Sequence, residues 1–235
     1  MAAVPISETT FIDDANLKAY YRLENVNDAT ANAYNLTNNG TTPFNAAKFN
    51  NGADFGASNS TKYLSTTSNL GIDGGNISIV AWINFTTLPG LGVESAFTGH
   101  GSSTNNIGNR LFMDNSAGVY TFRARRTKFG VSNIDSTRVF TPSTGIWYHV
   151  AYVYDGSNVL LYFNGVAQTP TAVSGNGTSG GTAGFAIGTT PDSYGKMSGL
   201  ADDVAVFNRA LTAAEVLSIY DGSAAKPTSG FFMLL

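Results

Sequence analysis

The segment from residue 146 to residue 169 constrains the fold more than any other part of the chain. It contains two apolar runs, Ile146–Asp155 and Val159–Phe163, followed by a shorter run, Val166–Thr169. An Asp-Gly-Ser-Asn turn separates the first two runs, and Asn164-Gly165 separates the last two. Asn-Gly is typical of a type I′ turn because both central residues need positive φ. The pattern therefore predicts an antiparallel meander of three strands.

The stretch Gly199–Val216 predicts a strand followed by a short helix. Residues 200–207 are mostly apolar and form the strand, and Asn208-Arg209 forms a tight turn. Thr212 and Glu215 then fit a Thr-x-x-Glu capping box, in which the hydroxyl and the carboxylate bind free amides at the start of a helix.

Short strands are predicted along the rest of the chain. The clearest is Asn76–Phe85, where Ile77, Ile79, Ala81 and Ile83 share one face while Val80 and Trp82 share the other. Shorter strands are expected at Leu17–Leu23, Ala47–Phe49, Gly52–Phe55, Lys62–Thr66 and Phe185–Gly188. Strands at a spacing of roughly 8 to 12 residues, with no long helix between them, predict an all-β antiparallel two-sheet sandwich with one short C-terminal helix.

These segments carry a family resemblance in their order along the chain. The matching pieces are Leu17–Leu23 with Asn27-Asp28, Lys48–Gly56, Ile77–Ile83, Trp147–Ala151, Tyr154–Gly156, Leu161–Gly165 and Gly199–Val216. Together they resemble the laminin-G-like domains of the concanavalin A-like lectin-glucanase superfamily, although Gly56 replaces an Asp that is usual there. The resemblance implies a jelly roll of two curved sheets, in which the concave sheet or the rim loops bind the ligand.

The chain is interpreted as one domain at residues 17–221, with an N-terminal lead at residues 1–16 and a C-terminal tail at residues 222–235. Its net charge of −3 argues against general nucleic-acid binding, and the absence of cysteine excludes thiol chemistry and cysteine metal sites. No stretch has the roughly 18 to 20 apolar residues of a membrane span, and no secretory signal is visible at the start.

Catalysis is not expected. A glycoside hydrolase needs two carboxylates about 5 to 10 Å apart, yet the acidic residues show no alternation along a strand. Asp202 and Asp203 are adjacent, so a regular strand would point them to opposite faces. His149 is interpreted as a packing residue, and His100 has no evident acidic partner for a Ser-His-Asp arrangement.

A structural calcium ion is the cofactor that the resemblance implies. Related proteins often hold it where the first loop meets the last strand, which gives Glu24 and Asp28 with Asp202 or Asp203 as candidate ligands. These residue types suit calcium, which takes six to eight oxygens. The alternative, given equal weight, is that Asp28 caps a turn and that Asp203 pairs with Arg209.

Ligand contacts are expected at a basic cluster and at rim loops. In Phe122–Lys128, Arg123 and Arg125 would share one strand face, whereas Arg126 and Lys128 would share the other. Arg123 and Arg125 suit the binding of an acidic glycan or an anionic protein. The alternative is that this basic segment is a solvated strand with no ligand. The candidate rim loops are Gly99–Asn109, with His100 and Asn105 as candidate ligand-binding residues, and Ser174–Gly184.

The tail ends in five large apolar residues, Phe231, Phe232, Met233, Leu234 and Leu235, which we interpret as an assembly element. The sequence therefore predicts a non-catalytic recognition module for a glycan or a surface protein, displayed on a virion or in an extracellular assembly. One alternative is a structural coat building block that assembles through this tail. A divergent glycoside hydrolase or lyase is a second.

Overall fold

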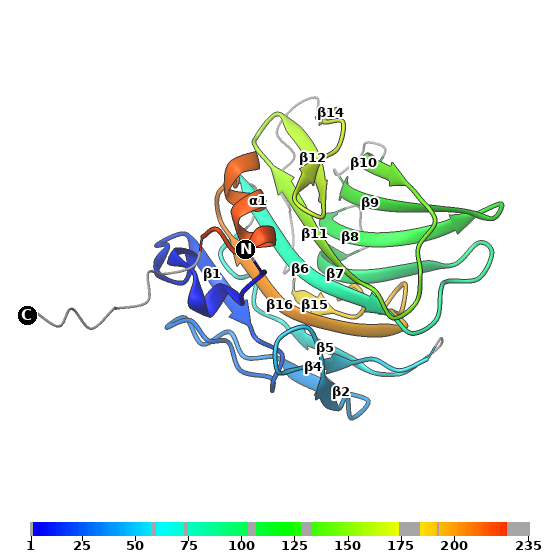
Figure 1. The fold of residues 1–235 in the computed structure, drawn as a ribbon, viewed down its shortest axis with the longest axis horizontal. Coiled ribbons are helices and arrows are strands. Elements are labelled where there is room, and N and C mark those ends of the chain that lie inside the picture. Colours follow the sequence, from blue (N-terminus) through cyan, green and yellow to red (C-terminus); the bar gives the residue numbers. More distant parts are fainter. Residues whose placement is uncertain are drawn as a thin grey trace, which may run out of the picture.

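The computed structural model describes residues 2–57, 60–72, 75–102, 107–127, 133–173, 184–191 and 193–224. Within these residues the strands form two antiparallel sheets, and one α-helix, α1 (Ala213–Asp221), lies near the C-terminal end (Figure 1). The predicted all-β jelly-roll sandwich is confirmed. The Asn105 prediction, most of the Ser174–Gly184 loop and the Phe231–Leu235 tail lie outside the described residues.

Nine of the described strands form the first sheet, in the order β13-β12-β11-β6-β16-β4-β3, with β1 paired to β16 and β14 paired to β12. The predicted meander is confirmed as β11-β12-β13, and its Asn164-Gly165 turn has positive φ at both residues. The nine strands are β1 (Leu17–Tyr21), β3 (Phe44–Ala46), β4 (Asn51–Asp54), β6 (Ile77–Phe85), β11 (Trp147–Tyr154), β12 (Asn158–Phe163), β13 (Val166–Ala167), β14 (Thr171–Ala172) and β16 (Gly199–Phe207).

Seven described strands form the second sheet, in the order β10-β9-β8-β7-β15-β5-β2. They are β2 (Thr37–Asn39), β5 (Tyr63–Thr66), β7 (Glu94–Ser102), β8 (Ile107–Ser116), β9 (Val119–Thr127), β10 (Ile134–Val139) and β15 (Phe185–Ile187). The sequence missed β7 and β8, because it placed a rim loop over residues 99–109. It also put a strand at Ala47–Phe49, where the backbone instead turns and the amide of Ala47 donates to the carbonyl of Asn50.

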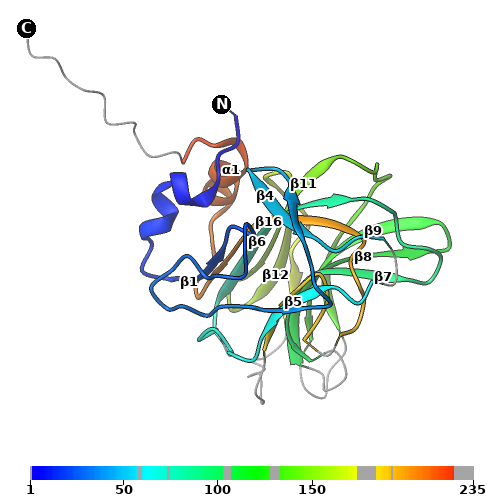
Figure 2. The ribbon, with the colours of Figure 1, turned by 90° about the horizontal axis from the view of Figure 1, so that it is seen from below.

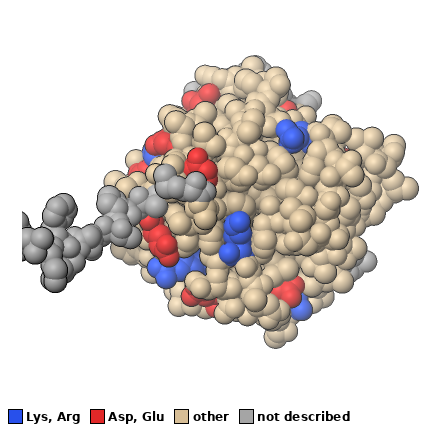
Figure 3. Space-filling model, viewed as in Figure 1, with Lys and Arg blue, Asp and Glu red and all other residues tan. Residues whose placement is uncertain are grey.

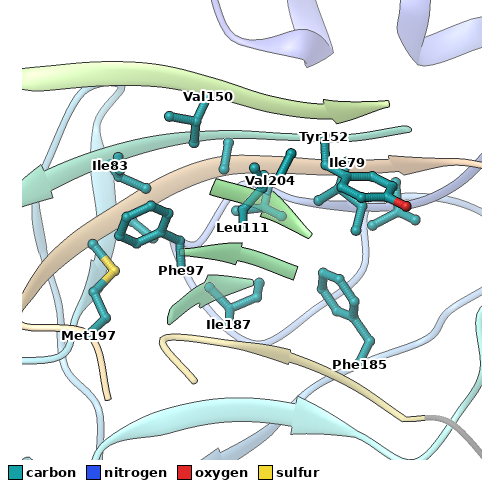
Figure 4. Close-up of a cluster of buried hydrophobic side chains, with 14 of the residues drawn as sticks. Ile79, Ile83, Phe97, Leu111, Val150, Tyr152, Phe185, Ile187, Met197 and Val204 are labelled. Atoms are coloured by element: carbon teal, nitrogen blue, oxygen red, sulfur yellow. The ribbon is translucent and has the colours of Figure 1, made fainter. Parts of the chain in front are cut away.

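The core between the sheets follows the predicted alternation on β6. Ile79 and Ile83 point inward with Val150 and Tyr152 of β11, and they meet Phe97, Leu111 and Ile187 of the second sheet (Figure 4). All of these side chains are buried. Burial of a large apolar side chain contributes roughly 1.5 to 3 kcal/mol, so this layer holds the two sheets together.

A second apolar cluster covers the outer face of the nine-stranded sheet. Val80 and Phe207 on that face pack with Val216 of α1 and with Ile6 and Phe11 from two short 3-10 helices, η1 (Ile6–Glu8) and η2 (Thr10–Asp13). Figure 2 shows this N-terminal helical segment beside α1. The α-helix and the two 3-10 helices of the described chain thus cover part of the outer face of the nine-stranded sheet.

The C-terminal helix begins as the sequence predicts, but its anchoring contacts differ from those expected. Thr212 and Glu215 form the capping box at its start. The Arg209 side chain pairs with Asp14 at 2.6 Å and with Glu215 at 2.8 Å. The alternative pairing of Arg209 with Asp203 is therefore wrong, because Arg209 binds the N-terminal segment and the helix start instead.

Candidate ligand-binding cleft

Strand alternation places a row of polar side chains on the outer face of the seven-stranded sheet. On β8, Leu111 and Met113 belong to the core, so Arg110, Phe112 and Asp114 point outward. On β9, Phe122 and Ala124 belong to the core, so Arg123 and Arg125 share the outer face, as predicted. Neighbouring strands β7 and β10 add Glu94 and Asp135.

Three arginines and three carboxylates form a lattice of ion pairs across these four strands. Arg110 lies 3.2 Å from Glu94, and Arg125 lies 3.8 Å from Glu94 and 2.7 Å from Asp135. Arg123 bridges Asp135 and Asp114, and its hydrogen bond to Asp114 raises its pKa. The predicted cationic pair Arg123 and Arg125 is thus compensated by carboxylates, so it presents no free positive patch.

Phe112 lies beneath this lattice and is fully buried, although it faces away from the core. The Arg110 and Arg125 guanidinium carbons lie 4.7 and 4.8 Å from the centre of its ring. Cation–π contacts of this kind add to the ion pairs and restrict the side-chain rotamers. The outer face is therefore a rigid surface, with Arg110 held in a fixed orientation.

A cleft of about 550 Å³ opens at one edge of this face. Its walls come from residues 89–95, which lead into β7, and from residues 194–198, which precede β16. The Tyr194 ring is half exposed, and Glu94 is partly exposed. The Lys196 ammonium lies 3.8 Å from the centre of the Tyr63 ring, and partial burial lowers its pKa. The lining residues are Pro89, Gly90, Gly92, Val93, Glu94, Ser95, Tyr194, Gly195, Lys196 and Ser198.

Hydrogen bonds fix the loop that carries Tyr194 and Lys196. The amide of Tyr194 donates to the Thr190 hydroxyl at 2.9 Å, and the amide of Ala96 on β7 donates to the Gly195 carbonyl at 2.8 Å. No sequence pattern indicated this site. Its two walls lie far apart in the sequence, and the Tyr-Gly-Lys of the second wall carries no motif.

The candidate ligand residue His100 does not lie on a rim. It sits on β7 opposite Asn109 of β8 and is buried between the sheets, with its Nδ1 3.4 Å from the Asn109 amide nitrogen. The prediction of a Gly99–Asn109 rim loop is wrong for its described residues, since both its ends are strand.

His149 has the packing role that the sequence assigns to it. The side chain is fully buried, and its ring centre lies 5.2 Å from that of Trp82 on the neighbouring strand. Burial, with a smaller contribution from Lys48, lowers the pKa of His149 to about 3, so the ring is neutral at physiological pH.

Two of the candidate calcium ligands, Asp202 and Asp203, share one small cavity. A β-bulge in β16 gives Asp203 a positive φ of 52°, and the cavity of about 80 Å³ is lined by both aspartates, Glu24 and Glu8. The expectation that the adjacent aspartates face opposite sides is therefore wrong. Burial raises the pKa of Asp202 to about 8 and that of Asp203 to about 7.

The quartet Glu24, Asp28, Asp202 and Asp203 does not form a ready metal centre. Asp203 accepts hydrogen bonds from the Tyr20 hydroxyl and the Ile6 amide, and Asp28 accepts bonds from the amides of Tyr20, Thr30 and Tyr34. Asp28 thus caps a turn, as the alternative expected. Among the described residues no group of three or more His, Asp or Glu side chains could hold a metal ion. Calcium binding stays a prediction that would require Asp203 to exchange its partners.

The comparisons with known proteins agree with this architecture. The model of the Laminin_G_3 family, described as the concanavalin A-like lectin/glucanases superfamily, matches residues 57–217, which is more than half of the chain. The chain belongs to this superfamily. A search of curated protein sequences finds no significant match.

Solved structures with the same fold include several binding domains. Domain 4 of AbnA, a GH43 extracellular arabinanase from Geobacillus stearothermophilus in complex with arabinotriose, has a TM-score of 0.69 at 20% identity, covering 87% of this chain and 98% of that one. The binding domain of botulinum neurotoxin DC in complex with rat synaptotagmin II has a TM-score of 0.66 at 14% identity, covering 88% and 51%.

A structure of botulinum neurotoxin type C, whose cell entry is described as dependent on two ganglioside molecules, gives a TM-score of 0.64 at 15% identity and covers 88% and 52%. This superfamily member therefore spans about half the length of the two neurotoxin chains. At these identities the likeness establishes the fold. No helix in the described parts of the chain is long and apolar enough to cross a membrane.

Proposed function

We propose that the protein is a non-catalytic carbohydrate-binding module and that the cleft beside Tyr194 is its glycan site. The observation that carries the proposal is the combination found there, an exposed tyrosine ring with one carboxylate and one ammonium group around about 550 Å³. Aromatic faces stack on the apolar face of a sugar ring. Glu94 accepts hydrogen bonds from sugar hydroxyls, and Lys196 donates to them.

The cleft chemistry supports binding rather than hydrolysis. Glu94 is the only acid among the residues that line the cleft, and its carboxylate is paired with Arg110. A retaining or inverting glycosidase needs a second carboxylate about 5 to 10 Å away. The AbnA domain with arabinotriose and the neurotoxin with gangliosides support a sugar as the ligand. The neurotoxin complex with synaptotagmin II supports a protein receptor as the alternative.

Display on a virion or in an extracellular assembly, and self-association through Phe231–Leu235, extend this proposal. In the competing structural role the tail alone would mediate assembly, and the cleft would bind nothing. Light scattering and sugar titration of the full chain and of a chain ending at Asp221 separate the two roles. A binding module binds the sugar in both forms of the chain, even where truncation removes its self-association, whereas a coat building block loses its assembly and has no sugar binding to retain.

Substitution in the cleft should weaken sugar binding without unfolding the domain. Tyr194→Ala removes the stacking ring, and Lys196→Ala removes the donor, so each should weaken binding by about tenfold. Isothermal titration with arabinotriose and with a ganglioside oligosaccharide measures the effect. Lys18→Ala, a lysine outside the cleft, serves as the matched control. Wild-type affinity in both cleft variants would exclude this cleft as the site.

A further inference from the structure

Three connecting segments at one end of the sandwich carry no charged residue. Residues 86–93 join β6 to β7, residues 115–120 form the β8–β9 hairpin end, and residues 139–146 join β10 to β11. None of them contains Asp, Glu, Lys or Arg. They lie at the right of Figure 1, and the same end of the molecule shows neither blue nor red atoms in Figure 3.

Aliphatic side chains project from these segments into solvent. Five of the eight exposed large hydrophobic residues in the described chain lie here, and they are 47% to 72% exposed: Leu91, Val93, Val119, Val139 and Ile146. We call these five residues with their three segments the apolar tip. Exposed apolar surface of this kind marks an interaction site for a membrane or a protein.

The backbone of the apolar tip is largely satisfied within the molecule. The amide of Gly92 donates to the Asn115 carbonyl at 2.8 Å, and that of Gly145 donates to the Phe85 carbonyl at 2.9 Å. The Asn115 side chain donates to the carbonyl of Pro89 at 3.0 Å and accepts from the amide of Gly118 at 3.1 Å. These bonds connect the segments, and they reduce the cost of moving the turns into a less polar medium.

We propose that the apolar tip docks onto the surface of a phospholipid bilayer. The five aliphatic side chains are spread over three segments that contain Gly, Ser and Thr, so they project from several points of the apolar tip. A fluid bilayer can adapt around such projections. A protein interface is instead built on aromatic and arginine anchors in complementary pockets, and the exposed residues of the apolar tip include neither.

Because the apolar tip carries no charged residue, we expect it to bind an electrically neutral membrane surface. No ion has to be desolvated when the apolar tip enters the interface, and no lysine or arginine is present to attract anionic lipid. Binding should therefore depend on buried apolar area alone. The segment that carries Leu91 also forms one wall of the cleft. In a step that rests on the proposed function, a glycan held there would lie next to the bilayer, as a glycolipid headgroup does.

Flotation with phosphatidylcholine vesicles tests the proposal on the full chain. We expect the wild type to float with neutral vesicles and the bound fraction to be insensitive to salt. The double variant Val119→Asp/Ile146→Asp should lower the partition coefficient at least tenfold. Leu217→Asp, at an exposed leucine on α1, should not change it. Val119→Ser/Ile146→Ser repeats the test with a milder change, and thermal melts verify that each variant is folded.

Brominated lipids give a second measurement, because Trp147 adjoins Ile146 whereas Trp82 is buried under Tyr220. Quenching of tryptophan fluorescence by these lipids in the wild type supports docking by this end. Absence of flotation, binding only to phosphatidylserine vesicles at low salt, or a dimer that the Val119 and Ile146 variants dissociate would overturn the proposal. Tyr194→Ala separates the two sites, because it should weaken sugar binding and still float like the wild type. It should also float like the wild type if the glycan proposal fails.

Discussion

Replacing Gly199 with alanine should destabilise the domain by about 4 kcal/mol or more, which is a large part of the 5 to 15 kcal/mol typical of folded domains. Gly199 begins β16 with a φ of 142°, a conformation that residues with a side chain rarely adopt. A Cβ atom there would collide with the backbone carbonyl of Asn84 on β6 and lie 3.0 Å from the Cα of Phe85. The backbones of β16 and β6 cannot separate at this point without loss of the central strand pairing.

Chemical denaturation of the wild type and the Gly199→Ala variant measures this effect as a difference in the free energy of unfolding. Gly118→Ala is the matched control. Gly118 also has a positive φ, of 84°, but an added Cβ would meet no atom within 4 Å. Gly118→Ala should therefore lower the free energy of unfolding by only about 1 to 2 kcal/mol, through backbone strain. Equal losses in the two variants would contradict the close approach of β16 and β6.

Raising the pH from 5 to 9 should lower the stability of the protein through Asp202 and Asp203. Burial raises their pKa values from 3.8 to about 8 and about 7, so the folded state favours the protonated carboxyls. This contribution to stability is complete below pH 3.8 and is lost as the pH rises through the folded-state pKa values. For Asp202 alone we expect a loss of about 2 kcal/mol or more, measured by denaturation in the presence of EDTA.

Asp202→Asn should reduce the pH dependence of stability to the part that Asp203 contributes, since the amide does not titrate, and this variant should be more stable than the wild type at pH 9. Asp54→Asn on β4 is the control and should retain the wild-type slope. A wild-type stability that is constant or rises across this range would refute the assignment. Adding calcium in place of EDTA tests the predicted metal site in the same experiment. If calcium raises the free energy of unfolding of the wild type at pH 8 but not that of Asp202→Asn, the Asp202 carboxylate holds the ion.

Local patterns were enough to predict most of the nine-stranded sheet. Strands β6, β11 and β12 are apolar almost throughout, and Asn164-Gly165 requires the positive φ values that define the hairpin. The helix start followed from Thr212 and Glu215. Each of these features depends on residues close together in the sequence, so the cause of the strand, the hairpin turn or the helix start can be recognised from the local sequence.

The seven-stranded sheet and the cleft were harder to predict from the sequence, because both depend on contacts between distant residues. On β8 and β9 the outward positions hold Arg110, Arg123 and Arg125, which pair with carboxylates from other strands, and Phe112, which lies beneath two of these arginines. An outer face built from paired arginines and a covered phenylalanine gives no simple apolar–polar alternation, so the sequence pattern does not predict these strands. The cleft likewise joins Glu94 to Tyr194 only through tertiary packing. A bulge at Asp203 inverted the expected direction of one carboxylate, which a strand pattern cannot predict.

The two ends of the described chain lie side by side, on the side of the molecule away from the apolar tip (Figure 1). The amide of Thr10 donates to the carbonyl of Ala224 at 3.1 Å, and Gly222 packs against Ala2. A tether fused to either end would therefore attach the domain on the side opposite the apolar tip, so that the apolar tip and the adjoining cleft would face away from the support. Copies anchored in a row on a support would all present the same face to a target, and many weak contacts would then add up to firm adhesion.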